Sequence, residues 1–309
     1  MAQIIPVDPY QFGRPPIQVR DLFFCAVLKL YNNHSGRKMS FDLKNAEGAG
    51  YISKAPHFNT ITDFLNCPDT YYLLKKILTI SAMPLAELED EYSLDSSGFA
   101  SHQFDRWKNV RFGLASNAWT KRRNFLKGHV AIGTRTHIIC ACEISSGYDA
   151  DVKKAPMLLQ TLGDNFKVKE LSADGAYSSK RIHQLVESIG ATPFIPFSPA
   201  RNPDKYAPEI WLRMYRYFSS HKEEFLRHYH RRSNVETVFS MVKVRLGEFL
   251  RCKSEIGKKS ELMLKFIAHN LCCIVSEMFE NNLHINFTNC LLKFVERKEE
   301  EFKKDNDKK

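Results

Sequence analysis

Apolar residues recur at helical spacing in the first third of the chain. They do so over residues 19–32, "VRDLFFCAVLKLYN", and again over 57–81, where Cys67 and Pro68 divide the pattern into two helices. The Pro-rich segment 1–16 is expected to be extended. A small helical unit is therefore predicted here. Its helix pairs are compatible with a helix-turn-helix DNA reader and equally with a packing or dimerisation unit, because helices joined by a turn are common.

The pattern changes to short β-rich segments near residue 90. "YSLDSSGFA" (92–100) predicts a strand that ends at Asp95, and "HVAIGTRTHIICACEI" (129–144) predicts two strands around a turn at 134–136. Further elements alternate along the chain: a helix at 155–166, a strand at 168–177, a helix at 178–190, a strand at 192–197, and helices at 207–228, 233–251 and 260–281. This order predicts an α/β fold with a mixed sheet.

Composition and charge favour a globular protein with an anionic partner. Of the 309 residues 43% are hydrophobic and 26% are charged, which is typical of a folded domain. The net charge is +10 and the isoelectric point is about 9.1. Such a basic excess is typical of nucleic-acid-binding proteins, although it also serves solubility.

Cysteine usage and hydropathy indicate a reducing, intracellular setting without a membrane span. None of the eight cysteines forms a C-x-x-C pair, which argues against a zinc ribbon or a thioredoxin-like site. Most lie in apolar runs such as 138–144 and 270–279, where a free cysteine acts as a small core residue. Residues 1–16 lack a signal-peptide pattern. The longest apolar run is broken by Lys265 and His269, which predicts a buried helix.

One acidic residue, Glu236, stands among arginines and lysines in "YHRRSNVETVFSMVK" (229–243). Taken alone, Ser233 and Glu236 have the spacing of a capping box. The helix beyond carries an apolar stripe: Val235, Phe239, Val242, Leu246 and Phe249. At about 100° per residue, Glu236 and Lys243 project within about 20° of each other, away from that stripe. If the helix extends back to Tyr229, then Tyr229 and Arg232 join this face, which suits holding a phosphate together with a metal ion.

The spacing Tyr229-x2-Arg232-x3-Glu236-x6-Lys243 resembles the Y-R-E-K signature of insertion-sequence DDE transposases of bacteria and archaea. "YSLDSSGF", "LSADGAYSS", "ATPFIPF" and "YHRRSNVETVFSMVK" follow in the order of that family, so the resemblance covers about residues 90–280. "GRPP" and "FNTITDFLNCPDT" are similar to the segment before its catalytic core. The resemblance implies a ribonuclease H-like mixed sheet flanked by helices at 89–283. A helical N-terminal region at 1–88, a candidate for DNA binding, would precede it, and a C-terminal segment with a charged tail at 284–309 would follow.

Carried over residue by residue, the family's three carboxylates are Asp95, Asp174 and Glu236, which would act in catalysis as metal ligands. The residues themselves agree in part, because Asp95 and Asp174 end predicted strands, where an α/β sheet presents its site. Aspartate at a strand end is also a common turn former. Other acidic residues nearby are Asp90, Asp105, Asp149 and Asp151.

The resemblance also implies a cofactor and a partner. Phosphodiester hydrolysis and transfer need charge stabilisation and an activated oxygen, which two Mg²⁺ ions supply, with Mn²⁺ as a substitute. Such hard cations prefer carboxylate oxygens. Tyr229, Arg232 and Lys243 match positions that contact the DNA end. The expected partner is double-stranded DNA, both terminal inverted repeats and target, bound by a homodimer in the cytoplasm, associated with the nucleoid and away from membranes.

Two other functions fit the same residues. One is a catalytically silent DNA-binding protein derived from a transposase, and the other is a ribonuclease H-like nuclease without strand transfer. The presence of all three carboxylates argues against the first, and the Tyr-Arg-Glu-Lys face argues against the second. Further basic clusters, any of which is either a DNA contact or a solvated face, lie at 120–127, 227–232 and 251–259.

Overall fold

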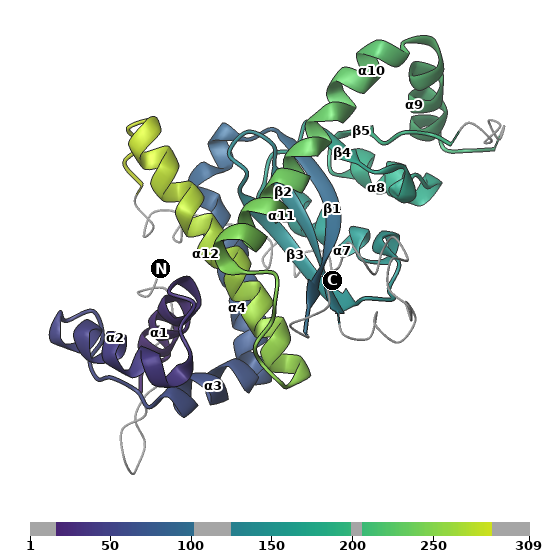
Figure 1. The fold of residues 1–309 in the computed structure, drawn as a ribbon. Helices are drawn as coiled ribbons and strands as arrows, with labels where there is room; N and C mark the ends of the chain where they lie inside the picture. Colours follow the sequence, from purple (N-terminus) through teal and green to yellow (C-terminus); the bar gives the residue numbers. More distant parts are fainter. Residues whose placement is uncertain (1–16, 102–124, 199–205, 286–309) are drawn as a thin grey trace, which may run out of the picture. The chain divides into compact units, whose positions relative to one another are not determined.

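A computed structural model describes residues 17–101, 125–198 and 206–285 of the chain (Figure 1). Its contacts divide the chain into two compact units. The first comprises Met1–Pro84 together with Arg251–Lys309, and the second comprises Leu85–Leu250.

The first unit is helical over its described residues. Its helices are α1 (Val19–Tyr31), α2 (Gly36–Gly48), α3 (Phe58–Asn66), α4 (Pro68–Ala82) and α12 (Glu255–Glu280). The predicted break at Cys67–Pro68 is confirmed, because Cys67 is extended and Pro68 is the first residue of α4, where its fixed φ suits a helix start. The polar helix α2 was not predicted. It buries only Met39, Leu43 and Ala46.

Helix α12 forms the centre of this first unit and packs against α1, α3 and α4. Asn270 Nδ2 donates to Ser81 Oγ of α4 at 2.8 Å. The sequence assigned residues 251–283 to the catalytic region, whereas these contacts group α12 with the N-terminal helices. The functional boundaries at 88 and 283 stay predictions. By length and composition α12 is the one described helix able to cross a membrane, but 61% of its most apolar window is buried inside the structure, as in a core helix.

The second unit contains a five-stranded sheet in the order β3-β2-β1-β4-β5. Its strands are β1 (Glu91–Ala100), β2 (Phe125–Gly133), β3 (Ile139–Ser146), β4 (Glu170–Ala173) and β5 (Thr192–Phe194). β2 is antiparallel to β1 and β3, and β4 is parallel to β1 and β5. Cys140 and Cys142 of β3 are buried, as predicted. The arrangement confirms the predicted mixed, ribonuclease H-like sheet.

The prediction that β1 ends at Asp95 is wrong. The strand continues to Ala100 and pairs with β2 along its whole length, from Tyr92 opposite Gly133 to Ala100 opposite Phe125. Burial of Phe99 and cross-strand pairing outweigh the low strand preference of "SSG". Asp95 therefore lies in the middle of β1, which is hydrogen-bonded to β2 on both sides of this residue.

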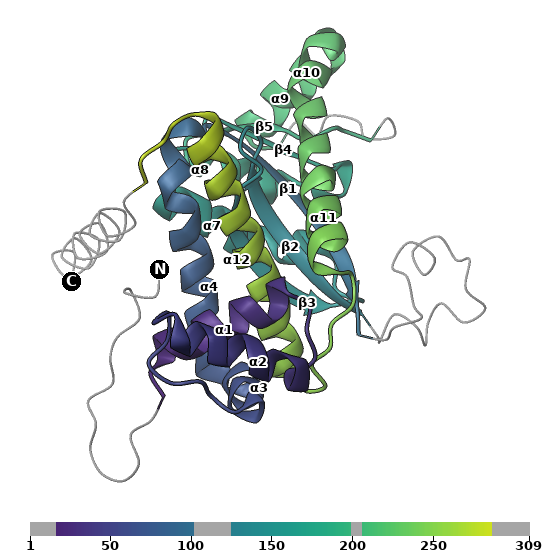
Figure 2. The ribbon, with the colours of Figure 1, turned by 60° about the vertical axis from the view of Figure 1, so that its left-hand side comes forward.

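Helices cover both faces of this sheet. They are α7 (Ala155–Asn165), α8 (Lys180–Ser188), α9 (Glu209–Ser220), α10 (Lys222–Tyr229) and α11 (Ser233–Leu246). The structure also contains four short 3₁₀ helices among its described residues: η2 (Met83–Leu88), η3 (Asp151–Lys153), η4 (Gly175–Tyr177) and η5 (His230–Arg232). Figure 2 shows the strands between α11 on one side and α7 and α8 on the other. α11 packs on β1. It ends at Leu246 and not at 251, because Gly247 adopts a φ of 83°.

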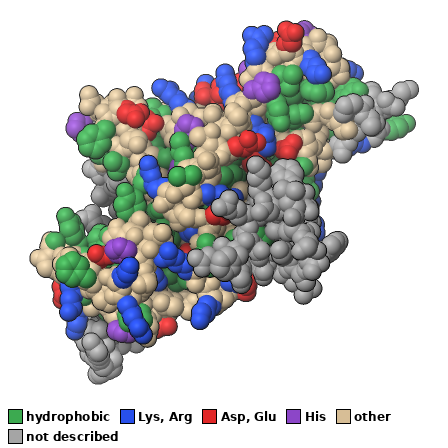
Figure 3. Space-filling view, in the orientation of Figure 1, with side chains coloured by type: hydrophobic (Ala, Val, Ile, Leu, Met, Phe, Trp, Pro, Cys, Tyr) green, Lys and Arg blue, Asp and Glu red, His purple; other side chains and the backbone are tan. Residues whose placement is uncertain are grey.

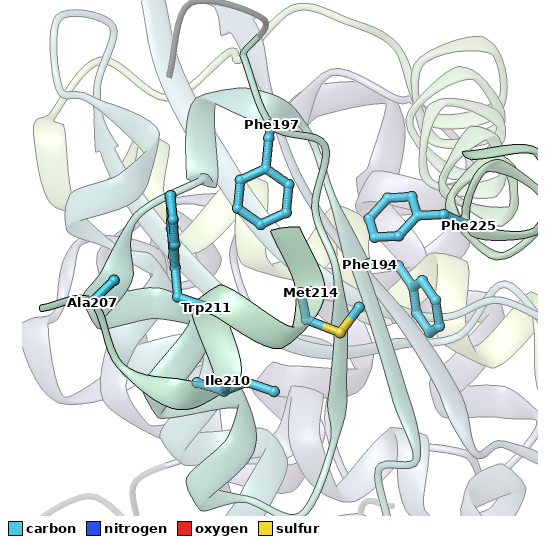
Figure 4. Packing of buried hydrophobic residues seen from close by; sticks show 7 residues of the cluster. All are labelled: Phe194, Phe197, Ala207, Ile210, Trp211, Met214 and Phe225. Carbon is cyan, nitrogen blue, oxygen red and sulfur yellow. The ribbon is translucent and has the colours of Figure 1, made fainter. Parts of the chain in front are cut away.

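The helix predicted at 207–228 is two helices that meet at His221. They close over an aromatic cluster that reaches β5 (Figure 4): Phe194, Phe197, Ala207, Ile210, Trp211, Met214 and Phe225. Trp211 lies edge-on to Phe197, with ring centroids 5.1 Å apart, and stacks on Tyr215 at 5.6 Å. The aromatic residues of α9 therefore serve packing. Tyr229 packs against the same cluster, which fixes the end of α10.

Candidate active site

Two of the predicted carboxylates are brought together by the sheet. β1 and β4 run parallel, with Leu94 opposite Ala173. Asp95 and Asp174 each follow these paired residues, so they occupy neighbouring positions on adjacent strands. Asp174 lies directly after β4, before the Gly175 turn, as the sequence predicted.

The third carboxylate joins them through Arg232. Arg232 Nη2 donates to Asp95 Oδ2 at 2.9 Å and lies 4.0 Å from Asp174 Oδ2. Arg232 Nη1 donates to Glu236 Oε1 at 3.0 Å. One guanidinium thus bridges all three predicted carboxylates. They range from sheltered to open: the exposed side-chain fraction is 17% for Asp95, 43% for Asp174 and 62% for Glu236.

Glu236 is not part of a capping box. An N-cap residue has non-helical backbone angles, but Ser233 has φ −56° and ψ −23° and follows Arg232 at −55° and −29°. α10, η5 and α11 therefore form one continuous helical segment, and no side chain caps the start of α11. Tyr229, Arg232 and Glu236 follow at helical spacing along it, as the sequence predicted for an extended helix. The capping interpretation of Glu236 is wrong.

Contacts that the sequence did not reveal hold this helical segment on the sheet. Arg231 pairs with Glu91 of β1 and lies 3.7 Å from Glu170 of β4. Asn234 Nδ2 donates to the Thr134 carbonyl at 2.8 Å, in the turn between β2 and β3. These anchors flank Arg232 on both sides and fix its backbone. In the sequence, Arg231 is one more residue of a basic run.

Electrostatics at the site reflect burial. Burial raises the pKa of the Asp95 carboxyl above its usual range, although Arg232 and the Ser96 N–H oppose the rise. Burial also raises the pKa of the Tyr177 hydroxyl, and Asp151, Asp95 and Asp174 add to the effect. The hydroxyl oxygen of Tyr177 is buried and accepts or donates no hydrogen bond among the described residues. A charged Asp95 is thus costly here, and Arg232 offsets part of that cost.

Tyr229 contacts both the site and the aromatic cluster. It is half-buried, interacts electrostatically with Arg232, and packs against the rings between α9 and α10. Burial raises the pKa of its hydroxyl. Tyr229 therefore takes part in hydrophobic packing and also lies beside Arg232.

Lys243 lies further along α11 over the same face of β1. Its Nζ donates to Ser97 Oγ at 3.0 Å, lies 3.7 Å from Glu248 Oε1, and is 5.1 Å from the centre of the Phe99 ring. Because side chains alternate along a strand, Ser97 and Asp95 share a face. Burial lowers the pKa of the Lys243 ammonium, and Glu248 opposes this.

Comparison with known families identifies the chain. Residues 88–271, more than half of the sequence, match the family described as "Transposase DDE domain". The chain belongs to this family. It is therefore a transposase, an enzyme class that acts on DNA, and the matched segment contains Asp95, Asp174 and Glu236. The Y-R-E-K signature and the roles of individual residues stay predictions.

The donor set suits the divalent metal ions that DDE transposases generally use. As the described side chains lie, no group of three or more His, Cys, Asp or Glu is positioned to hold a metal ion. A cationic group already stands between the three carboxylates, however, and the Nε atom of Arg232 is buried without a hydrogen-bond partner among the described residues. Carboxylate oxygens around a partly satisfied cation fit Mg²⁺ or Mn²⁺.

Of the other acidic residues that the sequence places near the site, Asp90 and Asp151 form ion pairs with basic residues. Asp90 pairs with Lys169, and Asp151 Oδ1 lies 2.8 Å from Lys127 Nζ and 3.5 Å from His129 Nδ1. Asp105 lies outside the described residues. Most of the basic cluster 120–127 also lies outside them. In Figure 3 the Lys and Arg side chains are dispersed over the described face, with acidic side chains between them.

The buried imidazole of His129 leads to a prediction on how the free energy of unfolding depends on pH. Burial lowers its pKa to about 4, below the ordinary 6.5, and Lys127 and Lys154 lower it further while Asp151 and Asp149 oppose them. The unfolded chain therefore binds a proton that the fold excludes as pH falls from about 6.5 to 4. We expect this site to remove about 3 kcal/mol of unfolding free energy across that range.

Chemical denaturation at several pH values between 7 and 4 measures this loss. His129→Gln should show a shallower decline than wild type, and the exposed His221→Gln should decline as wild type does. Equal slopes for His129→Gln and wild type would contradict a neutral, buried His129.

Proposed function

We propose that this transposase cleaves DNA at transposon ends and transfers the exposed 3′-hydroxyl into target DNA, with Asp95, Asp174 and Glu236 as ligands of Mg²⁺ or Mn²⁺. The observation that supports this most strongly is the convergence of the three carboxylates on one guanidinium. They come from a strand, a strand end and a helix that are far apart in sequence. Bound metal ions would stabilise charge at the phosphodiester and activate the attacking oxygen.

The position of each site residue suggests its role. Asp95 is held in the middle of β1 and Asp174 at the end of β4, so the sheet fixes both. Glu236 is exposed on α11, and its carboxylate accepts a hydrogen bond from Arg232. Arg232 and Lys243 would contact phosphates of the DNA end, Arg232 through its planar fork and Lys243 as a point charge. Tyr229 would support Arg232 from its place beside the guanidinium.

The partner proposed is double-stranded DNA carrying the terminal inverted repeats, followed by target DNA. A pair of ends must meet for transfer, which favours a homodimer in the DNA complex. The basic net charge supports contact with phosphates and predicts affinity that falls with salt.

A two-substrate assay tests this function. Wild-type protein with Mg²⁺ or Mn²⁺ is incubated with a terminal-repeat duplex, either intact or already ending in a 3′-hydroxyl, and with a target plasmid. We expect nicking of the intact duplex and joining of the pre-cut duplex to the plasmid. Cutting without joining would indicate a nuclease, and binding without either product would indicate a silent DNA-binding protein.

A further inference from the structure

We propose that Arg232 holds the place of the metal in the DNA-free transposase, and that it leaves the carboxylates for a DNA phosphate when a DNA end binds. The metal site would then assemble fully only on DNA. This inference rests on the proposed function, because it takes Asp95, Asp174 and Glu236 to be the metal ligands.

The position of the guanidinium carries the inference. Its two terminal nitrogens reach Asp95 and Glu236 at 2.9 and 3.0 Å, and Asp174 lies 4.0 Å away. A divalent cation that used the same carboxylates would stand next to this positive charge. Like charges a few ångströms apart in a sheltered site repel strongly. Arg232 and the metal therefore compete for these three residues.

Arg232 is incompletely satisfied where it stands. Its side chain is 17% exposed, and its Nε atom is buried without a hydrogen-bond partner among the described residues. An unpaired buried donor is costly. A phosphate can accept two parallel hydrogen bonds from a guanidinium. A DNA phosphate could therefore engage Arg232 through two nitrogens at once, including the unpaired Nε.

The exchange requires no movement of the main chain. Arg231 and Asn234 hold the backbone on either side of Arg232 through Glu91 and the Thr134 carbonyl. Rotation of one side chain is enough to release the carboxylates. Because coupling between two ligands is reciprocal, DNA should tighten metal binding and metal should tighten DNA binding by the same factor.

Mn²⁺ titration of the full chain, followed by electron paramagnetic resonance, tests the inference without requiring activity. Without DNA we expect Arg232→Gln to bind Mn²⁺ at least about tenfold more tightly than wild type, because the competing charge is gone. A terminal-repeat duplex should tighten Mn²⁺ binding by wild type and leave Arg232→Gln unchanged. Arg245→Gln is the matched control, since Arg245 is an exposed arginine in the last turn of α11, and it should behave as wild type.

The double variant Arg232→Gln with Glu236→Gln separates the two proposals. If the double variant loses the gain of the single variant, the three carboxylates hold the metal and Arg232 competes with it. If wild type and Arg232→Gln bind equally well, and both depend on Glu236, Arg232 is no competitor while the proposed metal site stands. If neither shows Glu236-dependent binding, even with DNA, the proposed site fails and the inference with it.

Thermal unfolding gives a second reading that does not depend on Mn²⁺ affinity. In EDTA, Arg232→Gln should melt below wild type, because three carboxylates then face one another without a cation. Mn²⁺ should raise its melting temperature more than that of wild type. Arg232→Lys, which keeps the charge but loses the two-nitrogen bridge, should lie between wild type and Arg232→Gln in both conditions. A Mn²⁺-induced rise that is equal in wild type and Arg232→Gln would overturn the inference.

Discussion

Glu236→Gln is expected to abolish strand cleavage and strand transfer, with a loss on the order of 10²–10³-fold or more, as for other groups that stabilise transition-state charge. The substitution keeps the shape of the side chain and removes the charge that a metal needs. Glu236 is 62% exposed, so the unfolding free energy should change little. Cleavage of a terminal-repeat duplex, with circular dichroism and DNA binding measured in parallel, checks this.

Glu223→Gln is the matched control, because Glu223 is an exposed glutamate in the first turn of α10. It should cut and join as wild type does. If Glu236→Gln cuts as well as wild type, Glu236 is no metal ligand and the proposed set of three carboxylates is wrong. If Glu236→Gln fails to fold, the Arg232–Glu236 ion pair is needed for the fold. The melting temperatures of the Arg232 variants described above would show this independently.

The sequence predicted the parts of the site that depend on local pattern. Strand and turn signals placed Asp174 at the end of a strand, and helical spacing placed Arg232 and Glu236 on one face. The prediction went wrong where non-local contacts decide. β1 continues past Asp95 because β2 pairs with it and the core takes up Phe99, neither of which the local letters "SSG" indicate.

Two other features also depend on contacts between distant segments. Helix α12 packs with α1, α3 and α4, although it follows the catalytic region in sequence. A buried apolar helix has the same sequence pattern whichever helices surround it, so the compact unit to which α12 belongs could not be predicted from the sequence. Similarly, the spacing from Tyr229 to Lys243 shows that Arg232 and Glu236 can meet. It does not show that Asp95, 137 residues away, shares the same guanidinium.

Asp95→Asn should also abolish cleavage and transfer, yet the melting temperature in EDTA should be equal to or above that of wild type. Burial raises the pKa of Asp95, so the fold disfavours its charged form relative to the unfolded chain. The penalty is present at pH values above the raised pKa of Asp95 and fades as pH falls through it. Asparagine removes it, while Asp174 and Glu236 still face Arg232.

Asp174→Asn provides the comparison, because Asp174 is 43% exposed and solvent screens its charge. It should lose activity to the same extent as Asp95→Asn without a gain in stability. Differential scanning calorimetry in EDTA, combined with the cleavage assay, distinguishes the two. A strongly lowered melting temperature for Asp95→Asn would mean that the Asp95–Arg232 pair is a structural ion pair. Loss of activity without loss of stability instead indicates a buried charge that is kept for the metal, at the expense of the fold.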